Sequence, residues 1–307
     1  MCIHFTMDVF SPQIVNPFGV PVYYRDTVTS TMDEARVLAA GGAEHGTVIT
    51  ADYQSSGRGR SSRAWIMNRG ENLSFTVILR YKILEEVPPC LTLKAGLALS
   101  FAIEDFAPAL RGAVQVKWPN DIMLLQKNGR GRKTAGILTE AVGGTVFLGV
   151  GINAAQTAFP PELSDKATSI SLTLYGGLDD SVFRRKTAAL TERRFILLEA
   201  VLSRLCEELE LSGREPGTKQ GPEQGPDTGW RERLETRLYM KGRRIQFIPG
   251  APAECIAGKE SLPKDRLIRG ILQGIGENGE IRIIPENEPV TNGGVLPFVT
   301  GELLVYE

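Results

Sequence analysis

The chain has 307 residues, 42% of them hydrophobic and 23% charged, with a net charge of −1. This balance indicates a globular protein with one large domain, or a large and a small one, and it excludes bulk attraction to nucleic acid or membranes. Its four cysteines are scattered, it has only two histidines, and neither a membrane span nor a signal peptide is evident, so we expect a cytoplasmic protein without a zinc site.

The N-terminal region is predicted to be an extended lead-in over residues 1–20, followed by a helix. Thr31 and Glu34 fit a capping box at the start of this helix, and Gly41 supplies its stop. The start of the helix therefore carries the hydroxyls of Ser30 and Thr31. Such hydroxyls either cap the helix only or form a polar pocket wall rich in N–H groups.

A cationic loop, Gly57–Trp65, joins a strand predicted at 47–53 to another at 72–79. The second strand alternates apolar and polar side chains, as half-buried strands do. The loop holds three arginines and two glycines. Its glycines let backbone N–H groups approach a ligand, and its arginines offer planar donors to a carboxylate or phosphate. Taken alone, the stretch also fits a solvated loop or an RGG-like contact to nucleic acid.

The middle of the chain is predicted to form a helix over 91–106 and then several short strands. Lys117 and Trp118 are neighbours in the first of these strands, so they point to opposite faces. The segment Pro119-Asn120-Asp121 then breaks the strand. The strands expected here cover 114–118, 122–125, 133–141 and 145–153, with turns at 128–132 and 143–144.

The C-terminal half begins with a single long amphipathic helix, predicted over 181–211 from its near-helical apolar period. The stretch 212–229 has five glycines, three prolines and no other apolar side chain, so we expect a disordered insert. A short helix from Trp230 leads to a small all-β module of barrel or SH3-like size. Its strands are expected at 243–249, 268–275, 280–284 and 298–306, around an extended loop at 251–266.

Strands and helices are mixed in the chain without a regular βαβ alternation or an internal repeat. This order favours an α+β fold with a mixed, mainly antiparallel sheet over a doubly wound parallel sheet. We expect the lead-in at 1–20, a main domain at 21–237 that contains the 212–229 insert, and a small domain at 238–307.

Polar residues gather at the ends of the predicted strands and of the first helix. An anion-handling chemistry fits them, because no histidine or cysteine pair is placed for hydrolysis. Bringing a carboxylate up to a triphosphate costs on the order of 4 kcal/mol at about 4 Å and an effective dielectric near 20. Cations offset this repulsion, and Asp121 is a candidate ligand for Mg²⁺. The set favours an acyl-adenylating enzyme. Its clusters are Ser30-Thr31, Gln54 with Arg58–Arg63, Lys117–Asp121 and Lys133–Gly136.

The motifs resemble those of biotin–protein ligases and follow the same order along the chain. The resemblance covers residues 22–307 apart from the insert and the 251–266 loop. It implies a class II synthetase-like catalytic domain followed by an SH3-like β-barrel domain. The motifs that carry it are Gly57-Arg58-Gly59-Arg60, Arg63-Ala64-Trp65, Lys117-Trp118-Pro119-Asn120-Asp121, Lys133-Thr134-Ala135-Gly136 and Gly149-Val150-Gly151-Ile152-Asn153.

This resemblance implies a reaction in two steps. Biotin and ATP first give biotinyl-5′-AMP and pyrophosphate, and a lysine of a biotin carboxyl carrier domain then takes the biotinyl group and releases AMP. The residues implied to bind biotin are Ser30, Thr31, Met32, Gln54, Arg58, Gly59, Arg60, Lys133 and Gly136. Those implied to bind the nucleotide are Arg58, Trp65, Asn120, Asp121, Lys133 and Asn153. Catalysis is assigned to Lys133, Arg60 and Asp121, with Mg²⁺ at Asp121.

The expected ligands are thus biotin, ATP and Mg²⁺, with no tightly bound prosthetic group, and the expected partners are the carrier protein and a second copy of the chain. We expect no DNA partner, because too few residues precede the first motif for a helix-turn-helix domain. Met32 stands where relatives often have asparagine, and Ser61-Ser62 replaces a basic or glycine-bearing pair. A lipoyl or octanoyl ligase and a nucleic-acid-binding module are the alternative interpretations.

Overall fold

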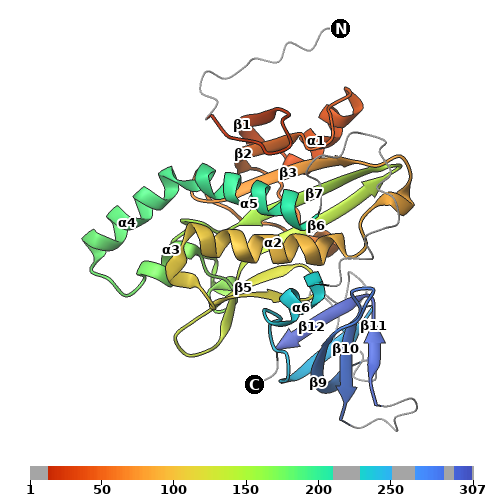
Figure 1. Cartoon of the computed structure of the whole chain (residues 1–307). Helices are drawn as coiled ribbons and strands as arrows, with labels where there is room; N and C mark the ends of the chain where they lie inside the picture. Colours follow the sequence, from red (N-terminus) through yellow and green to blue (C-terminus); the bar gives the residue numbers. More distant parts are fainter. Residues whose placement is uncertain (1–12, 210–228, 251–266, 287–293, 306–307) are drawn as a thin grey trace.

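The computed structural model describes residues 13–209, 229–250, 267–286 and 294–305. Within them the chain forms two sheets (Figure 1), a seven-stranded one in the order β1-β2-β3-β7-β6-β5-β4 and a five-stranded one in the order β11-β10-β9-β8-β12. In the large sheet β1 and β2 are parallel and the other pairs are antiparallel. The predicted α+β class with a mainly antiparallel sheet is confirmed. The 251–266 loop and most of the 1–20 lead-in and of the 212–229 insert lie outside the described residues.

The large sheet is built from strands in the first half of the chain. They are β1 Val22–Val28, β2 Val48–Gln54, β3 Leu73–Arg80, β4 Val114–Lys117, β5 Asp121–Leu125, β6 Gly131–Val142 and β7 Thr145–Ile152. The helices are α1 Thr31–Ala40, α2 Leu91–Phe106, α3 Ile170–Tyr175, α4 Asp180–Glu192, α5 Arg194–Glu208 and α6 Gly229–Glu235. The helix predicted over 91–106 has the observed bounds of α2.

The main core lies between the large sheet and the helix pair α2 and α5, which cover one face of the sheet (Figure 1). Leu97 of α2 and Val201 of α5 are fully buried there, together with Phe75 of β3. Helix α1 covers part of the opposite face, where Ala35 packs with Ile49 and Phe147 in a second cluster. The rest of that face, along β6 and β7, is left for the cavity described below.

Strand β3 corrects one expectation, because it is buried on both faces rather than on one. Leu73 through Leu79 are all buried, including the polar Ser74 and Thr76. The alternation of polar and apolar residues reflects hydrogen bonding inside the protein, since Thr76 Oγ1 donates to Thr31 Oγ1 at 2.9 Å. A sequence pattern cannot distinguish a hydroxyl facing water from one facing a buried partner.

The single helix predicted over 181–211 is also corrected, because α4 and α5 are separate helices that break at Arg193. The guanidinium of Arg193 lies over the ring of Phe106, and Arg194 pairs with Asp52 of β2 at 2.7 Å. These contacts hold α5 on the core, while α4 extends away from it (Figure 1) with only Leu190 buried. The short helix α3 was not predicted.

The small sheet packs next to the turn between β4 and β5. The indole N–H of Trp118 donates to the carbonyl of Gly279 at 3.0 Å, and its ring lies 5.9 Å from that of Phe247.

The expected strand at 298–306 is two strands, separated before Gly301, whose φ is +152°. Among the described residues β11 and β12 are not paired, so closure into a barrel stays a prediction. The strands are β8 Arg244–Pro249, β9 Ile268–Ile275, β10 Ile281–Pro285, β11 Leu296–Phe298 and β12 Gly301–Val305.

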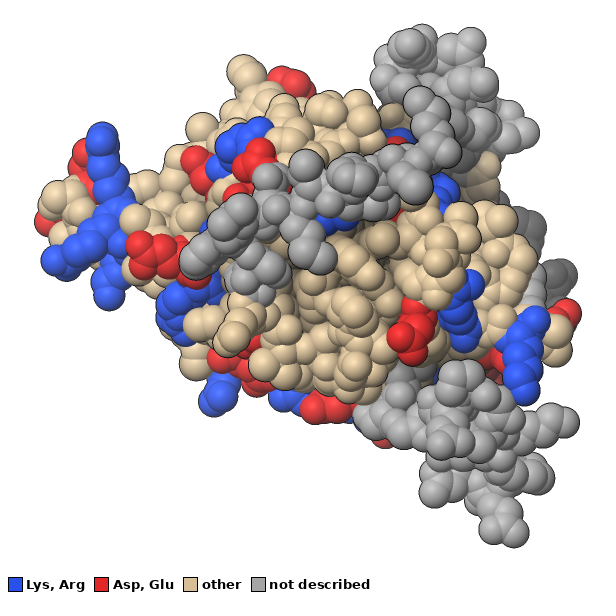
Figure 2. All heavy atoms as spheres, turned by 90° about the horizontal axis from the view of Figure 1, so that it is seen from above, with Lys and Arg blue, Asp and Glu red and all other residues tan. Residues whose placement is uncertain are grey.

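The outer surface carries charges of both signs. On the face shown in Figure 2 basic and acidic side chains are interspersed, including along the projecting helix α4, where Arg184 pairs with Asp180 at 2.9 Å. None of the helices in the described ranges is long and apolar enough to cross a bilayer.

Candidate functional site

A cavity of about 1130 Å³ lies over β6 and β7, between the start of α1, the cationic loop and the edge of the small sheet. Strand alternation explains why it lies there. Leu148 and Val150 of β7 point into the main core, so Gly149 and Gly151 face the opposite side and leave it open. Every residue predicted for the site lines this cavity. They are Ser30, Thr31, Met32, Gln54, Arg58, Gly59, Arg60, Trp65, Asn120, Asp121, Lys133, Gly136 and Asn153.

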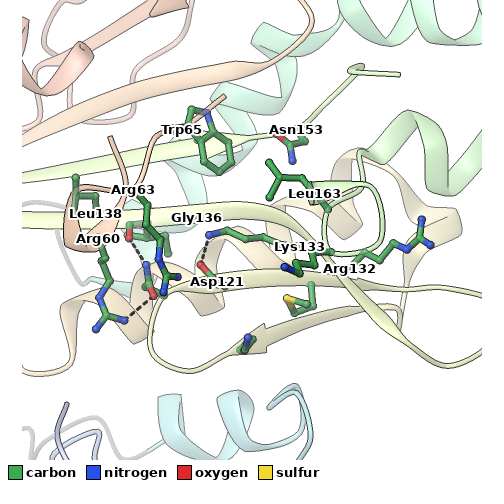
Figure 3. A pocket seen from close by; sticks show the side chains of 18 of the residues that line it. Arg60, Arg63, Trp65, Asp121, Arg132, Lys133, Gly136, Leu138, Asn153 and Leu163 are labelled. Atoms are coloured by element: carbon green, nitrogen blue, oxygen red, sulfur yellow. Dashed lines mark hydrogen bonds and ion pairs between the residues drawn. The ribbon is translucent and has the colours of Figure 1, made fainter. Parts of the chain in front are cut away.

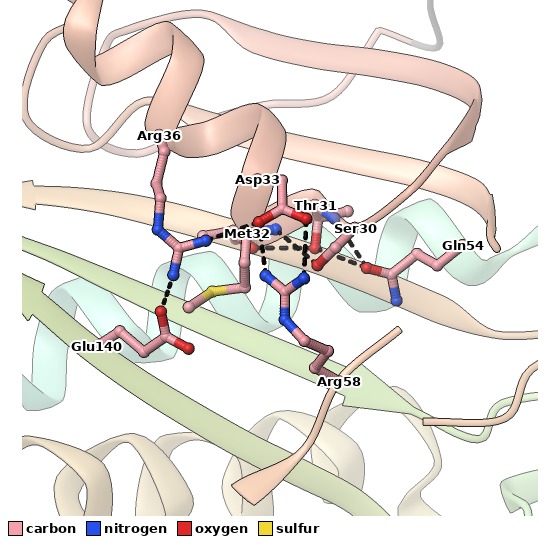
Figure 4. Close-up of polar contacts among 9 residues, drawn as sticks. Ser30, Thr31, Met32, Asp33, Arg36, Gln54, Arg58 and Glu140 are labelled. Carbon is pink, nitrogen blue, oxygen red and sulfur yellow. Dashed lines mark hydrogen bonds and ion pairs between the residues drawn. The ribbon is translucent and has the colours of Figure 1, made fainter. Parts of the chain in front are cut away.

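The α1 end of the cavity combines buried hydroxyls, an amide and a thioether (Figure 4). Ser30 caps the helix, since its Oγ accepts from the amide of Met32 at 3.3 Å. The predicted capping box at Thr31 and Glu34 is therefore wrong. Thr31 instead donates through its backbone N–H and its hydroxyl to Gln54 Oε1, at 2.8 and 3.1 Å. Helix start and strand end are thus fastened together, and both reach the cavity.

Met32 is the apolar element of this end. It is 3% exposed, and a Cβ added to Gly149 would lie 2.7 Å from its Sδ. The thioether therefore rests directly on the backbone of β7. At this position the chain presents a soft apolar surface rather than a side-chain amide.

The cationic loop forms a small two-stranded ribbon that arches over the cavity. Trp65 donates its backbone N–H to the carbonyl of Gly57 at 2.9 Å, and Gly59 donates to that of Arg63 at 2.8 Å. The ribbon turns at Ser61 and Ser62, whose φ angles are +54° and +57°. Two consecutive left-handed residues with side chains are a strained arrangement. The serine pair therefore makes this turn less favourable than a pair containing glycine would.

We expect this strain to appear as loop opening. Ser62→Val places a branched Cβ at a left-handed position, whereas Ser62→Gly removes the Cβ. The free energy of loop opening should therefore differ by about 1–2 kcal/mol between the two variants. Tryptic cleavage within the loop should then be about 5- to 30-fold faster in the valine variant than in the glycine variant, because cleavage follows the open population. Equal cleavage rates would show that the turn does not limit opening.

The arginines of the loop reach three different parts of the protein. Arg58 pairs with Asp33 of α1, Arg60 Nη1 donates to Asn120 Oδ1 at 3.1 Å, and Arg63 pairs with Glu302 of β12 at 2.8 Å. The loop is thereby tied to both walls of the cavity and to the small sheet. Sequence reasoning missed Asp33 and Glu302 as site residues, and it placed Arg63 in the loop motif without giving it a role. Their signal is only spatial, because the partners lie far apart in the chain.

The floor of the cavity carries a lysine–carboxylate pair beneath an indole ring (Figure 3). Lys133 Nζ lies 2.6 Å from Asp121 Oδ1 and 5.9 Å from the centroid of the Trp65 ring. The ring in turn lies against Gly151, where an added Cβ would come within 2.4 Å of Trp65 Cε2. Glycine is required at that position for the indole to rest on the sheet.

Two further cations contribute to the electrostatics of the floor. Burial lowers the pKa of Lys117, although nearby Asp121 opposes this shift. Burial likewise lowers the pKa of Arg60, and the negative charge of Asp121 again opposes this shift. The floor thus gathers Lys133, Lys117 and Arg60 near Asp121, an arrangement suited to anionic groups that spread their charge over several oxygens.

Two buried polar atoms on the cavity wall have no hydrogen-bond partner within the described structure. They are the indole N–H of Trp65 and Oδ1 of Asn153. The other end of the Asn153 amide is held, since Nδ2 donates to the carbonyl of Thr168 at 3.1 Å. Unpaired buried groups of this kind are costly and point to a ligand with polar groups of its own.

Comparisons with known proteins find similarity in the part of the chain that holds most of the residues lining this site. Residues 22–156 match the profile of the Biotin/lipoate A/B protein ligase family. The chain is 40% identical over 160 residues to the bifunctional ligase/repressor BirA of Bacillus subtilis. The matched stretch covers 50% of this chain and 47% of that protein. It is 35% identical over 146 residues to the biotin–[acetyl-CoA-carboxylase] ligase of Mycobacterium tuberculosis, or 46% of this chain and 51% of that protein. The chain spans about half the length of these curated relatives.

Solved structures extend the similarity beyond the matched segment. A point mutant of the Aquifex aeolicus biotin protein ligase, in complex with biotin, superposes with a TM-score of 0.63 at 25% identity, covering 93% of this chain and 97% of that one. The ligase of the same organism in complex with biotin and ATP gives a TM-score of 0.63 at 24% identity, over 92% and 97% of the two chains. The fold of both sheets is therefore shared with that protein.

Proposed function

We propose that this chain, whose residues 22–156 carry a domain of the Biotin/lipoate A/B protein ligase family, uses ATP to attach biotin to a lysine of a biotin carboxyl carrier domain. The observation that carries the proposal is the position of Lys133 on the cavity floor, beside Asp121 and near the ring of Trp65. An amino group there can meet both a substrate carboxylate and a phosphate. The named relatives and the biotin-bound Aquifex aeolicus structure support biotin as the acid.

In the proposed complex the acid occupies the α1 end of the cavity. Biotin has an apolar ring and chain and a polar ureido head. Ser30, Thr31 and Gln54 offer hydroxyl and amide groups to the head, and Met32 and Gly149 offer an apolar surface to the ring. Pockets with few, well-placed polar groups on an apolar wall are typical of such ligands.

The nucleotide occupies the opposite end. We assign the adenine to the ring of Trp65 by stacking, with its polar edge near the unpaired Oδ1 of Asn153. The phosphates then extend toward Arg60 of the cationic loop and toward Asn120 and Lys133, which line the same cavity. Arg58 and Gly59 belong to the loop that closes over the bound acid and nucleotide.

The proposed reaction has two steps, formation of an adenylate and transfer of the acyl group to the carrier. A carboxylate oxygen of biotin attacks the α-phosphorus of ATP, the bond to the β-phosphate breaks, and pyrophosphate leaves. The amine of the carrier lysine then attacks the carbonyl carbon, AMP leaves, and the nitrogen loses a proton as the amide forms. Lys133 and Arg60 stabilise the charge that develops on the phosphate oxygens. The arched loop excludes water from the mixed anhydride between the two steps.

The donors at Asp121 fit a magnesium ion that arrives with the nucleotide. The described residues contain no group of three or more metal-binding side chains, and Asp121 is a single carboxylate paired with Lys133. One carboxylate plus phosphate oxygens and water is the coordination that Mg²⁺ favours at nucleotide sites. Asp121 would hold the ion, and the ion would neutralise part of the phosphate charge.

The organisation of the chain is part of the proposal. Residues 21–237 form the catalytic domain, and residues 238–307 form a small SH3-like domain that contacts the loop through Glu302. The macromolecular partners are the carrier domain and a second copy of this chain.

Pyrophosphate exchange tests the function directly. Purified protein should exchange labelled pyrophosphate into ATP when biotin and Mg²⁺ are present, and should label a carrier domain at its lysine. Lipoate or octanoate in place of biotin should give no exchange. Exchange with lipoate alone would assign the chain to the lipoate branch of the family, and no exchange with any acid would refute an adenylating activity.

A further inference from the structure

The arginine at the entrance of the cationic loop is already paired within the protein. Arg58 donates through Nη1 and Nη2 to both carboxylate oxygens of Asp33, at 2.9 and 2.5 Å (Figure 4). Asp33 lies on the first turn of α1, next to Met32 at the α1 end of the cavity. The end of Arg58 that suits a carboxylate is therefore occupied by a carboxylate of the protein itself.

Asp33 has a second arginine. Arg36 donates to Asp33 Oδ1 at 2.7 Å, and its other amino group pairs with Glu140 of β6. The network thus holds two guanidinium groups and two carboxylates and joins the loop, α1 and the large sheet. If Arg58 left, Asp33 would keep Arg36 as a partner. Departure of Arg58 consequently leaves no carboxylate without a counter-charge.

Solvent screens this pair and limits its contribution to folding, because both side chains are more than one-third exposed, Arg58 at 37% and Asp33 at 38%. The Arg58 guanidinium lowers the pKa of the Asp33 carboxyl, and Asp33 raises the pKa of Arg58. Both groups are therefore charged at neutral pH. A weak, fully charged pair at the mouth of a cavity is readily exchanged for another anion.

We propose that Asp33 is a latch for the cationic loop, holding Arg58 when no acid is bound and yielding it to the carboxylate or adenylate of the bound acid. Asp33 is thus a competitor of the anionic ligand. This inference rests on the proposed function, since it takes biotin as the acid. It assigns to Asp33 a positioning role that acts only through Arg58.

A competitor has a signature that a purely structural residue lacks. Removing its charge should tighten the binding of an anionic ligand and leave a neutral analogue unaffected. Because exposed ion pairs are weak, Asp33→Asn should bind biotin about two- to fivefold more tightly than the wild type. Biotin amide, which has no carboxylate, should bind both proteins equally. The ligand-free Asp33→Asn protein should also be cut faster by trypsin in the loop, and biotin should abolish that difference.

Titration calorimetry of the full chain with biotin and with biotin amide tests the latch. In an Arg58→Gln background the same titrations should show no effect of Asp33→Asn, because the Arg58 guanidinium that Asp33 pairs with is then absent. Asp26→Asn is the matched control, since Asp26 pairs with Arg69 at 2.6 Å outside the cavity lining. Its dissociation constants should equal those of the wild type.

Three results would overturn the latch. They are weaker biotin binding by Asp33→Asn, an equal change for biotin and biotin amide, and an effect that persists without Arg58. Weaker binding would mean that Asp33 orients Arg58 for the ligand instead of competing for it. A wild-type protein that binds no biotin would refute the proposed function and the latch together, whereas normal wild-type binding with any of the three results refutes the latch alone.

Discussion

Lys133→Met is expected to lower the rate of biotin-dependent pyrophosphate exchange by about 10²- to 10³-fold. Methionine keeps an unbranched side chain of similar length but removes the charge that lies 2.6 Å from Asp121 on the cavity floor. The loss should fall on kcat more than on the KM for either substrate. Negative charge develops on the phosphate oxygens as the carboxylate attacks, and Lys133 stabilises that charge. Because this interaction is made mainly in the transition state, its loss lowers kcat.

The control for this prediction is another paired lysine. Lys241 forms an ion pair with Glu235 at 2.8 Å, outside the cavity. Lys241→Met should leave the exchange rate within about twofold of the wild type, because a surface pair of this kind contributes little. Thermal unfolding of both variants establishes that each is folded. A Lys133→Met protein with near-normal kcat would remove this lysine from the reaction.

The second large effect is expected at two glycines of β7 that face the same side. An added Cβ would lie 2.4 Å from the Trp65 ring at Gly151 and 2.7 Å from Met32 Sδ at Gly149. We expect Gly151→Ala to push the indole from its place and raise the KM for ATP by about 10- to 100-fold, since aromatic stacking on a base is worth about 1–3 kcal/mol. The KM for biotin should change little.

Gly149→Ala should show the reverse selectivity. The added Cβ meets the flexible end of Met32, so the thioether shifts into the cavity. The KM for biotin should therefore rise, by a smaller factor than the rise in the KM for ATP expected for Gly151→Ala. The KM for ATP should stay unchanged. Gly177→Ala is the matched control, because nothing lies within 4 Å of a Cβ there. Initial rates of pyrophosphate exchange at varied biotin and varied ATP measure both constants. Equal effects of the two cavity variants on both substrates would contradict the assignment of the two ends.

The sequence predicted most of the local structure correctly, since the signals involved are local. The helix α2 has a continuous apolar pattern and a proline just beyond its end, and its predicted bounds match. Strands β2 to β7 of the large sheet begin and end within a few residues of their predictions, whereas β1 was not predicted. Errors occurred where distant parts of the chain decide the outcome. The α4–α5 break depends on the contacts of Arg193 and Arg194 with Phe106 and Asp52, which no local pattern contains.

The site residues that were predicted from ordered motifs all line one cavity in the tertiary structure. Two of their partners, Glu302 and Asp33, were not predicted. Glu302 follows Arg63 by 239 positions, and it reaches the loop only because the small sheet packs beside the β4–β5 turn. Asp33 was hidden for a different reason. An acidic residue in the first turn of a helix is ordinary for helix stability, so nothing local marks it as a partner of Arg58.

By itself, then, the sequence determined the chemistry that this protein can carry, because residue types and their order along the chain fix which donors, cations and glycines are available. It also determined the α+β class, through the periodicity of its apolar residues. Only the tertiary structure decided which of those groups meet. The pairing of the loop arginines with Asp33, Asn120 and Glu302 depends on the packing of α1 and of the small sheet around the large one. Contacts between residues this far apart come from the burial of shared surfaces, which local sequence does not encode.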